Sequence, residues 1–322
     1  MTDRICILLC VDENYRRQAG VAVSSLARAT PGGLDVHIAA FDRDRAASAA
    51  IFDPLVARHP DMSLTFHDLD ASVFDGLHVT KAFPRSIYTR LIFDRFLDPA
   101  IERVLYIDAD VVVCGDLRPL WSTDLGGAVL AASRDPFRQD PEQIGFAEDE
   151  PYFNSGMLLI DRARWRQEGA EYAILDLLAA RGRELPWMDQ DALNMVLRGK
   201  VRFVGMEWNY QPRCADVPPD FLQLTEADYR ELRRRPRLVH YTTSHKPWNE
   251  AFRVHYSDLF FAAQDAAGLP DPLRSRRPQN AAERALAVKT ALRWRFPGAF
   301  RALRRVLKPQ AAARMYRAGP QG

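Results

Sequence analysis

The sequence predicts an α/β fold in which a mostly parallel sheet is flanked by helices. Short runs of apolar and β-branched residues alternate along the chain with longer segments of helical periodicity. Proline and glycine separate the two kinds of segment. The chain has 322 residues, of which 47% are hydrophobic, so it can enclose a large core. This alternation is typical of a doubly wound, Rossmann-like sheet, which binds its ligands beyond the carboxyl ends of the strands.

The first strand and the following helix are the clearest elements. Residues 5–11 are an uninterrupted apolar run, which predicts a buried strand. Apolar residues then recur at helical spacing from Tyr15 to Ala29, and a proline and two glycines at 31–33 end the segment. The connection between strand and helix therefore lies where a ligand is expected.

Further strands and helices alternate after this unit. We expect strands at 36–41 and 64–67, with a helix at 44–58 between them, and a helix at 86–96. Proline at positions 270 and 272 marks the end of the globular part. The predicted organisation is a globular domain of residues 1–270 and an extension of residues 271–322.

Residues 104–113 are the most informative segment, because two aspartates interrupt a β-branched apolar run. In one continuous strand, Asp108 and Asp110 point to the same side. Buried carboxylates are costly unless a cation or hydrogen-bond donors meet them. Hard cations such as Mg²⁺ and Mn²⁺ prefer carboxylates and also bind phosphates. Asp-x-Asp occurs four times in the chain, so the apolar context, more than the spacing, predicts a metal and diphosphate site here.

The charge of the chain is divided unevenly. The net charge is +2, but residues 271–322 carry +11 and residues 1–270 carry −9. This division predicts a basic extension that meets an anionic partner. Cys6 and Cys10 share one face of the first strand without a Cys-x-x-Cys spacing, which favours core cysteines. No segment has the pattern of a membrane span or a secretory signal, so we expect a cytoplasmic protein.

Six motifs between residues 5 and 250 resemble those of the retaining glycosyltransferases of family 8, in the family's order. These enzymes use nucleotide-diphosphate sugars and have the GT-A fold, and the chain looks most like bacterial enzymes that build lipopolysaccharide or related glycans. The motifs are 11–15 (Val-Asp-Glu-Asn-Tyr), 88–91 (Tyr-Thr-Arg-Leu), 105–110 (Leu-Tyr-Ile-Asp-Ala-Asp), 153–159 (Phe-Asn-Ser-Gly-Met-Leu-Leu), 189–191 (Asp-Gln-Asp) and 240–248 (beginning His-Tyr and ending Lys-Pro-Trp).

The resemblance implies a metal held by Asp108, Asp110 and His240. Because an imidazole joins two carboxylates, Mn²⁺ suits the set better than Mg²⁺, which remains the alternative. A divalent ion would neutralise the leaving diphosphate. If the family resemblance is set aside, the alternative for His240 is a hydrogen-bonded residue at the end of a strand.

The resemblance also implies a site for a UDP-sugar donor. Its residues are Asp12, Asn14, Tyr15, Arg90, Asp108, Ala109, Asp135, Asn154, Ser155, Asp189, Gln190 and Lys246. Taken alone, Asp12 or Asn14 could cap the following helix. Likewise, Arg90 could be a surface arginine and Lys246 a solvated lysine.

Asp189 and Gln190 are the implied catalytic residues, with Asp189 on the sugar hydroxyls and Gln190 beside the anomeric carbon. The alternative is that residues 189–191 only begin a helix, since acidic residues are favourable in the first turn of a helix. An amide is a poor nucleophile, so we favour front-face substitution in which Gln190 stabilises the oxocarbenium-like centre. Thr243 stands where the family usually has glycine, and residues 81–86 diverge where acceptor contacts are expected, so the acceptor is not implied.

Apolar and basic residues alternate in the extension, at 281–292 and 299–307. Basic amphipathic helices with aromatic residues lie on anionic membranes, and we expect this role here. No nucleic-acid recognition module accompanies the charge. A helix packed on the globule, or a flexible tail, is the alternative.

Together these observations predict a Mn²⁺-dependent retaining glycosyltransferase. It would transfer galactose or glucose from a UDP-sugar to a glycan or glycolipid, in lipopolysaccharide or cell-surface glycan synthesis, at the inner face of the cytoplasmic membrane. A non-catalytic binding scaffold of the same fold is one alternative. A sugar-phosphate nucleotidyltransferase is another, but it requires a glycine-rich basic loop that residues 11–15 do not provide.

Overall fold

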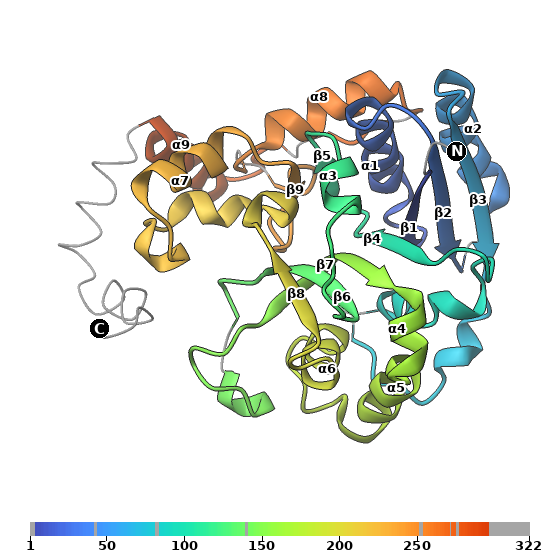
Figure 1. Cartoon of the computed structure of the whole chain (residues 1–322). Helices are drawn as coiled ribbons and strands as arrows, with labels where there is room; N and C mark the ends of the chain where they lie inside the picture. The colour runs from blue at the N-terminus through green and yellow to red at the C-terminus, as the bar shows by residue number, and fades with distance from the viewer. Residues whose placement is uncertain are drawn as a thin grey trace.

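The computed structural model describes residues 4–41, 44–80, 84–138, 141–250, 254–270, 272–274 and 277–295. A seven-stranded sheet forms its centre, with the strand order β3-β2-β1-β4-β7-β6-β8, and β5 and β9 form a second small sheet (Figure 1). The strands are β1 (Ile5–Val11), β2 (Leu34–Ala40), β3 (Met62–Asp68), β4 (Arg103–Ile107), β5 (Val111–Val113), β6 (Leu130–Arg134), β7 (Phe153–Asp161), β8 (Val201–Val204) and β9 (Leu238–His240).

Helices cover both faces of the large sheet (Figure 1). One core lies between the sheet and α1, α2 and α8, and the other lies between the sheet and α4, α5 and α6. The helices are α1 (Arg16–Ala29), α2 (Arg45–Arg58), α3 (Arg118–Trp121), α4 (Arg162–Gln167), α5 (Ala170–Arg181), α6 (Asp189–Val196), α7 (Glu226–Arg234), α8 (Ser257–Ala267) and α9 (Ala281–Arg295).

The alternation of side chains along β1 serves both cores. Ile7 and Leu9 belong to the α1 side, whereas Cys6 and Leu8 belong to the other side. Cys6 is buried and not in a disulfide, as the sequence predicts for a core cysteine. Burial raises the pKa of its thiol to about 12, so it stays protonated.

The sheet is mostly parallel, as predicted, but one strand departs from a doubly wound arrangement. β1 runs parallel to β2 and β4, β2 to β3, and β6 to β8. β7 runs antiparallel to both β4 and β6, and Phe153 at its start pairs with Arg134 at the end of β6. The start of β7 therefore lies at the same edge as the ends of β4 and β6.

Several predicted elements are confirmed, one is helical but of the 3₁₀ kind, and one predicted strand is divided in two. β1, β2 and β3 confirm the strands predicted at 5–11, 36–41 and 64–67, and α2 confirms the helix predicted at 44–58. The observed ends lie within two residues of the predicted ends. Residues 86–96 do not form an α-helix. They form two 3₁₀ turns, Arg85–Leu91 and Phe93–Arg95.

Residues 104–113 are not one strand. β4 ends at Ile107 and β5 begins at Val111, where the chain leaves the large sheet and pairs with β9. Asp108 and Asp110 therefore lie in the turn between two sheets. The prediction that strand alternation brings them to one side is wrong, and the turn brings them together instead.

The extension begins with a short contact to α8. The Gln264 side chain exchanges two hydrogen bonds with the Leu273 backbone, at 3.0 and 2.8 Å. α9 confirms the helix predicted at 281–292, but none of these residues is buried, and Leu286, Val288 and Leu292 are exposed. Residues 299–307 lie outside the described residues.

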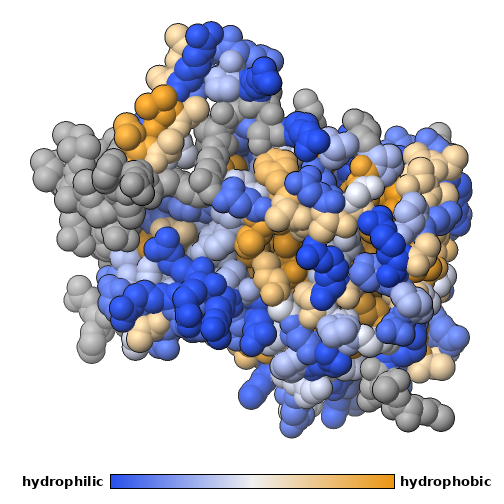
Figure 2. Space-filling model, turned by 90° about the horizontal axis from the view of Figure 1, so that it is seen from above, coloured by the Kyte–Doolittle hydropathy of each residue, from blue (hydrophilic) through white to orange (hydrophobic). Residues whose placement is uncertain are grey.

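The surface on the α8 side is largely hydrophilic, with scattered apolar clusters (Figure 2). Among the described residues, no helix is long and apolar enough to cross a membrane.

Candidate functional site

One cavity of about 1030 Å³ opens along the edge of the sheet where β1, β4 and β6 end and β7 begins. It brings together all the predicted donor-binding and metal-binding side chains, although they come from distant parts of the chain. These residues are Asp12, Asn14, Tyr15, Arg90, Asp108, Ala109, Asp110, Asp135, Asn154, Ser155, Asp189, Gln190, His240 and Lys246.

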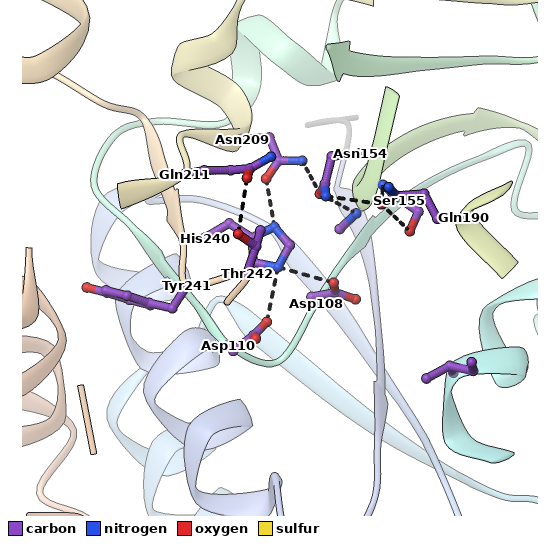
Figure 3. A network of polar contacts seen from close by, with 12 residues as sticks. Asp108, Asp110, Asn154, Ser155, Gln190, Asn209, Gln211, His240, Tyr241 and Thr242 are labelled. Carbon is purple, nitrogen blue, oxygen red and sulfur yellow. Dashed lines mark hydrogen bonds and ion pairs between the residues drawn. The ribbon is translucent and has the colours of Figure 1, made fainter. Parts of the chain in front are cut away.

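Asp108, Asp110 and His240 form the candidate metal site (Figure 3). One ligand atom from each lies within 4.8 Å of the others. The His240 Nε2 atom is 3.3 Å from Asp108 Oδ2 and 3.2 Å from Asp110 Oδ1. Two carboxylate oxygens and one imidazole nitrogen are a set that fits Mn²⁺.

Asn209 orients the His240 ring, and sequence reasoning missed it. Its Oδ1 atom lies 2.8 Å from His240 Nδ1, and its Nδ2 atom donates to Asn154 Oδ1 at 2.9 Å (Figure 3). Since Asn209 Oδ1 accepts, the His240 Nδ1–H donates, which leaves Nε2 to face the carboxylates. Asn209 ends the 3₁₀ turn Met206–Asn209, where no motif marks the sequence.

Gly156 provides the space for the metal site. A Cβ atom at this position would lie 2.0 Å from His240 Cε1 and 2.7 Å from Asp108 Oδ2. Its carbonyl oxygen also accepts from the Asp108 N–H at 2.9 Å. A side chain here would therefore displace two of the three candidate ligands.

Positive and negative side chains offset one another within the candidate metal site. Burial disfavours the imidazolium, but the Asp110 and Asp108 carboxylates outweigh it and raise the pKa of His240 to about 9. Burial also disfavours an ionised Asp110, yet the positive charges of Lys246 and His240 hold its pKa below the ordinary value. A cation that binds here must therefore displace a proton from His240.

Arg90 links the metal site to the sugar-binding candidates. Its Nη1 atom is 3.2 Å from Asp108 Oδ1, and its Nε atom is 3.1 Å from Asp189 Oδ2. Nη1 also donates to the Ser155 carbonyl at 2.9 Å, and the guanidinium lies 4.7 Å from the centre of the Tyr106 ring. Arg90 is buried, so the alternative of a surface arginine is wrong.

Lys246 is also buried, which excludes a solvated lysine. Its Nζ atom donates to Asp110 Oδ2 and to the Tyr241 carbonyl. It therefore places a positive charge directly beside the metal site. Thr243, which replaces the usual glycine, lines the cavity, and its hydroxyl accepts from the His245 N–H at 3.2 Å.

Both the oxygen and the nitrogen of the Gln190 side-chain amide form hydrogen bonds. Its Oε1 atom accepts from Asn154 Nδ2 at 3.1 Å and from the Ser155 N–H at 3.0 Å (Figure 3). Its Nε2 atom donates to the Tyr152 hydroxyl at 3.2 Å. Tyr152 in turn donates to Asp191 at 2.6 Å, so this tyrosine is a second residue that the motifs did not reveal.

Asp189 is buried at the first position of α6, so it also begins a helix, as the alternative interpretation holds. Burial is the largest influence on its carboxyl and raises its pKa to about 6, and Arg90 opposes this only in part. Its Oδ2 atom is ion-paired with Arg90 but accepts no hydrogen bond from any residue that the structure describes. A sugar hydroxyl could supply that bond.

Asp135 completes the polar wall. Its Oδ2 atom accepts from Asn154 Nδ2 at 3.2 Å, and its Oδ1 atom accepts from Gln211 Nε2 at 3.1 Å. Gln211 precedes the 3₁₀ turn Pro212–Asp216 and also accepts from the Thr242 hydroxyl at 3.1 Å. Gln211 is the third contributor that the sequence did not single out.

Asp12 lies at the opposite end of the cavity and forms a turn before α1. Its Oδ1 atom accepts from the Asn14 and Tyr15 N–H groups at 2.9 and 3.2 Å. The cap position of α1 is Tyr15, with no side-chain cap bond, so the capping alternative is wrong for Asp12 and Asn14. The Tyr15 ring meets Trp248 edge-on, with the ring centres 6.4 Å apart.

Residues 6–251 match the sequence model of glycosyl transferase family 8. The chain belongs to this family. General stress protein A of Bacillus subtilis (strain 168) is 27% identical over 268 residues, which are 79% of this chain and 91% of that protein. Lipopolysaccharide 1,2-glucosyltransferase of Escherichia coli (strain K12) is 28% identical over 253 residues, which are 74% of this chain and 71% of that protein.

A solved structure of the galactosyltransferase LgtC with donor and acceptor sugar analogs shares the fold of this family 8 chain. The TM-score is 0.69 at 27% identity, and the match covers 83% of this chain and 98% of that one. The predicted GT-A fold is therefore confirmed. This family 8 chain is a retaining hexosyltransferase.

Proposed function

We propose that this family 8 enzyme transfers galactose or glucose from a UDP-sugar to a glycan or glycolipid, with Mn²⁺ as the cofactor. The order of groups along the cavity carries this proposal. Asp12 follows β1, the metal site follows β4, and Asn154 and Asp135 lie at the adjoining ends of β7 and β6. A nucleoside, a diphosphate and a hexose have the same linear order.

Asp108, Asp110 and His240 would hold the ion. When bound, Mn²⁺ supplies Lewis-acid neutralisation of the departing diphosphate. Lys246 adds a positive charge at the same place, since it already contacts Asp110. Asp12, Asn14 and Tyr15 would bind the uracil and ribose at the other end.

Asp189, Asp135 and Asn154 would bind hydroxyl groups of the transferred sugar. Two N–H groups already engage Gln190 Oε1, so little nucleophilic character remains there. This supports front-face substitution, in which Gln190 stabilises positive charge on the sugar while the acceptor oxygen attacks from the leaving-group side. Mass spectrometry that detects a glycosyl adduct on Gln190 or Asp189 would overturn this mechanism.

Synthesis of lipopolysaccharide or a related surface glycan is the proposed setting. Two Escherichia coli relatives are named as lipopolysaccharide glucosyltransferases, with 28% and 26% identity. We place the enzyme in the cytoplasm, with the basic residues of 271–322 binding the anionic inner face of the cytoplasmic membrane. Residues 1–270 would form the catalytic domain.

The decisive experiment is hydrolysis of a panel of nucleotide sugars by the purified protein with Mn²⁺. We expect slow release of UDP from UDP-galactose or UDP-glucose, with loss of release after EDTA treatment and in Asp110→Ala. Asp176→Ala, which removes an exposed carboxylate from α5, is the matched control and should behave as wild type. Undiminished hydrolysis in Asp110→Ala would contradict the metal assignment, and failure to bind any UDP-sugar would contradict the donor assignment.

A further inference from the structure

Among the described residues, four arginine and lysine side chains line the cavity, and they fall into two pairs. Arg90 and Lys246 are engaged by carboxylates, as described above. Arg138 and Arg213 line the same cavity, yet within the described part of the chain neither has a carboxylate oxygen within 4.0 Å. Two positive charges thus face the cavity, and no described residue places a counter-charge in contact with them.

Both guanidinium groups are held in place by aromatic rings and backbone carbonyls. The Arg213 Cζ atom lies 3.6 Å from the centre of the Phe137 ring, and Nη2 donates to the Phe137 carbonyl at 3.3 Å. Arg138 Nη2 donates to the Ala147 carbonyl at 2.6 Å. Arg138 Nη1 is buried, and no residue that the structure describes accepts a hydrogen bond from it. A buried N–H group without an acceptor is costly, so a ligand acceptor would relieve a real penalty.

The location of the pair separates it from the nucleoside end. Along the edge of the sheet, the order is β1 with Asp12, β4 with the metal site, then β7 and β6. Arg138 lies in the segment that follows β6, with its Cζ atom 6.0 Å from the centre of the Tyr152 ring. Tyr152 contacts Gln190, and Arg213 lies beside Phe137 near Arg138, so the pair lies next to the proposed sugar pocket, on the side where we expect the acceptor to enter.

We propose that Arg138 and Arg213 bind an anionic substituent, a phosphate or a carboxylate, on the acceptor glycan. This inference rests on the proposed function, because it assumes a UDP-hexose in the other part of the cavity. A planar guanidinium can donate two parallel hydrogen bonds to either anion. The pair would thus select acceptors whose sugar next to the attacking hydroxyl group carries negative charge.

The test is calorimetric titration of the protein loaded with Mn²⁺ and UDP. The probes are glucose 6-phosphate, glucuronic acid and glucose, and the two anionic probes distinguish phosphate from carboxylate. We expect at least one anionic sugar to bind about tenfold tighter than glucose, since charge-assisted hydrogen bonds are worth that much. Arg138→Met and Arg213→Met should each remove the preference, and Arg213→Lys should restore part of it.

Arg134→Met is the matched control. Arg134 is a nearby arginine on β6 that does not line the cavity, and its guanidinium bonds to Gln223. This variant loses the same charge but should keep the full preference for the anionic sugar. A preference that Arg134→Met abolishes equally would reveal a general electrostatic effect and would overturn the assignment to Arg138 and Arg213.

Other results would also overturn the inference. Equal affinity for anionic and neutral sugars, or no binding of either, excludes an anion-binding acceptor site. A donor panel in which only UDP-uronic acids are cleaved would assign the arginines to the donor. Binding of Mn²⁺ and UDP is measured first in the same samples, so failure of the proposed function is seen separately.

Discussion

At the scale of single residues, the candidate site depends on the residues that orient the metal ligands and Gln190, and not on the metal ligands alone. Asn209, Gly156 and Tyr152 touch the metal ligands or Gln190 and fix their orientation. Loss of such a contact to a metal ligand typically weakens metal binding or activity by about 10- to 100-fold. Three predictions belong to this scale.

Asn209→Ala should weaken Mn²⁺ binding about 10- to 100-fold, because His240 loses the acceptor that fixes its ring and tautomer. Electron paramagnetic resonance of free Mn²⁺ measures the affinity. Gln167→Ala, which removes an exposed amide from α4, serves as the control. An unchanged affinity in Asn209→Ala would show that His240 is not oriented by this contact.

Gly156→Ala should fold but lose measurable Mn²⁺ binding, since the added methyl group overlaps His240 and Asp108. The cost to stability should be about 1–3 kcal/mol, as for overpacking elsewhere. Gly20→Ala is a useful contrast, because its Cβ would lie 2.6 Å from an Ile51 side-chain carbon, away from the cavity. It should reduce the free energy of unfolding without changing Mn²⁺ affinity; metal binding retained by Gly156→Ala would refute the steric argument.

Asp189 should make the fold less stable as the pH rises. Burial raises its pKa from 3.8 to about 6, so the ionised form is disfavoured in the folded state, and stability falls between these two values. Relative to wild type, Asp189→Asn should gain about 2.5 kcal/mol of unfolding free energy between pH 4 and pH 8, and it should lose sugar transfer. Parallel stability–pH curves for the two proteins would disprove the raised pKa.

At the scale of elements, the departure of the chain from β4 to β5 creates the metal site. β5 leaves the large sheet, pairs with β9 and packs against α1, so Asp110 and His240 meet across the small sheet. The Val113 N–H donates to the buried Ser25 hydroxyl of α1 at 3.0 Å, which anchors β5. The position of the turn therefore depends on a contact between strand and helix.

Ser25→Ala should lower the free energy of unfolding by about 1–3 kcal/mol, because the buried Val113 N–H loses its acceptor. Chemical denaturation measures the change. The exposed Ser72→Ala should alter stability by less than about 0.5 kcal/mol. If Ser25→Ala is equally neutral, another group or water must satisfy Val113, and the anchoring argument fails.

At the scale of the whole molecule, the catalytic part and the basic extension differ in packing. Both cores surround the large sheet, whereas residues 281–292 of α9 bury no side chain. The contact between Gln264 and Leu273 shows that the chain stays attached to α8 slightly beyond the predicted boundary at 270. A truncation should therefore begin after this contact.

Removal of residues 278–322 should abolish binding to phosphatidylglycerol vesicles while leaving UDP-sugar hydrolysis within about twofold of wild type. The reason is that the extension contributes positive and apolar side chains for an anionic surface, and each basic residue near such a surface adds about 1 kcal/mol. Phosphatidylcholine vesicles, measured by co-sedimentation, are the control. Vesicle binding that survives the truncation would assign membrane contact to another face.

The sequence by itself determined the alternation of strands and helices, the family and most of the residues that line the candidate site. Local periodicity and short motifs carry this information, because each depends on neighbours in the chain. It also revealed the unequal charge of the extension, which is a matter of composition.

Only the tertiary structure decided the reversed direction of β7, the break between β4 and β5, and the contributions of Asn209 and Gln211. All of these depend on pairings between segments far apart in the chain. A run such as 104–113 has the same local preference for extended structure whether it lies in one sheet or two, so pairing partners decide between them. Asn209 and Gln211 act through hydrogen bonds to distant residues, which no spacing in the sequence records.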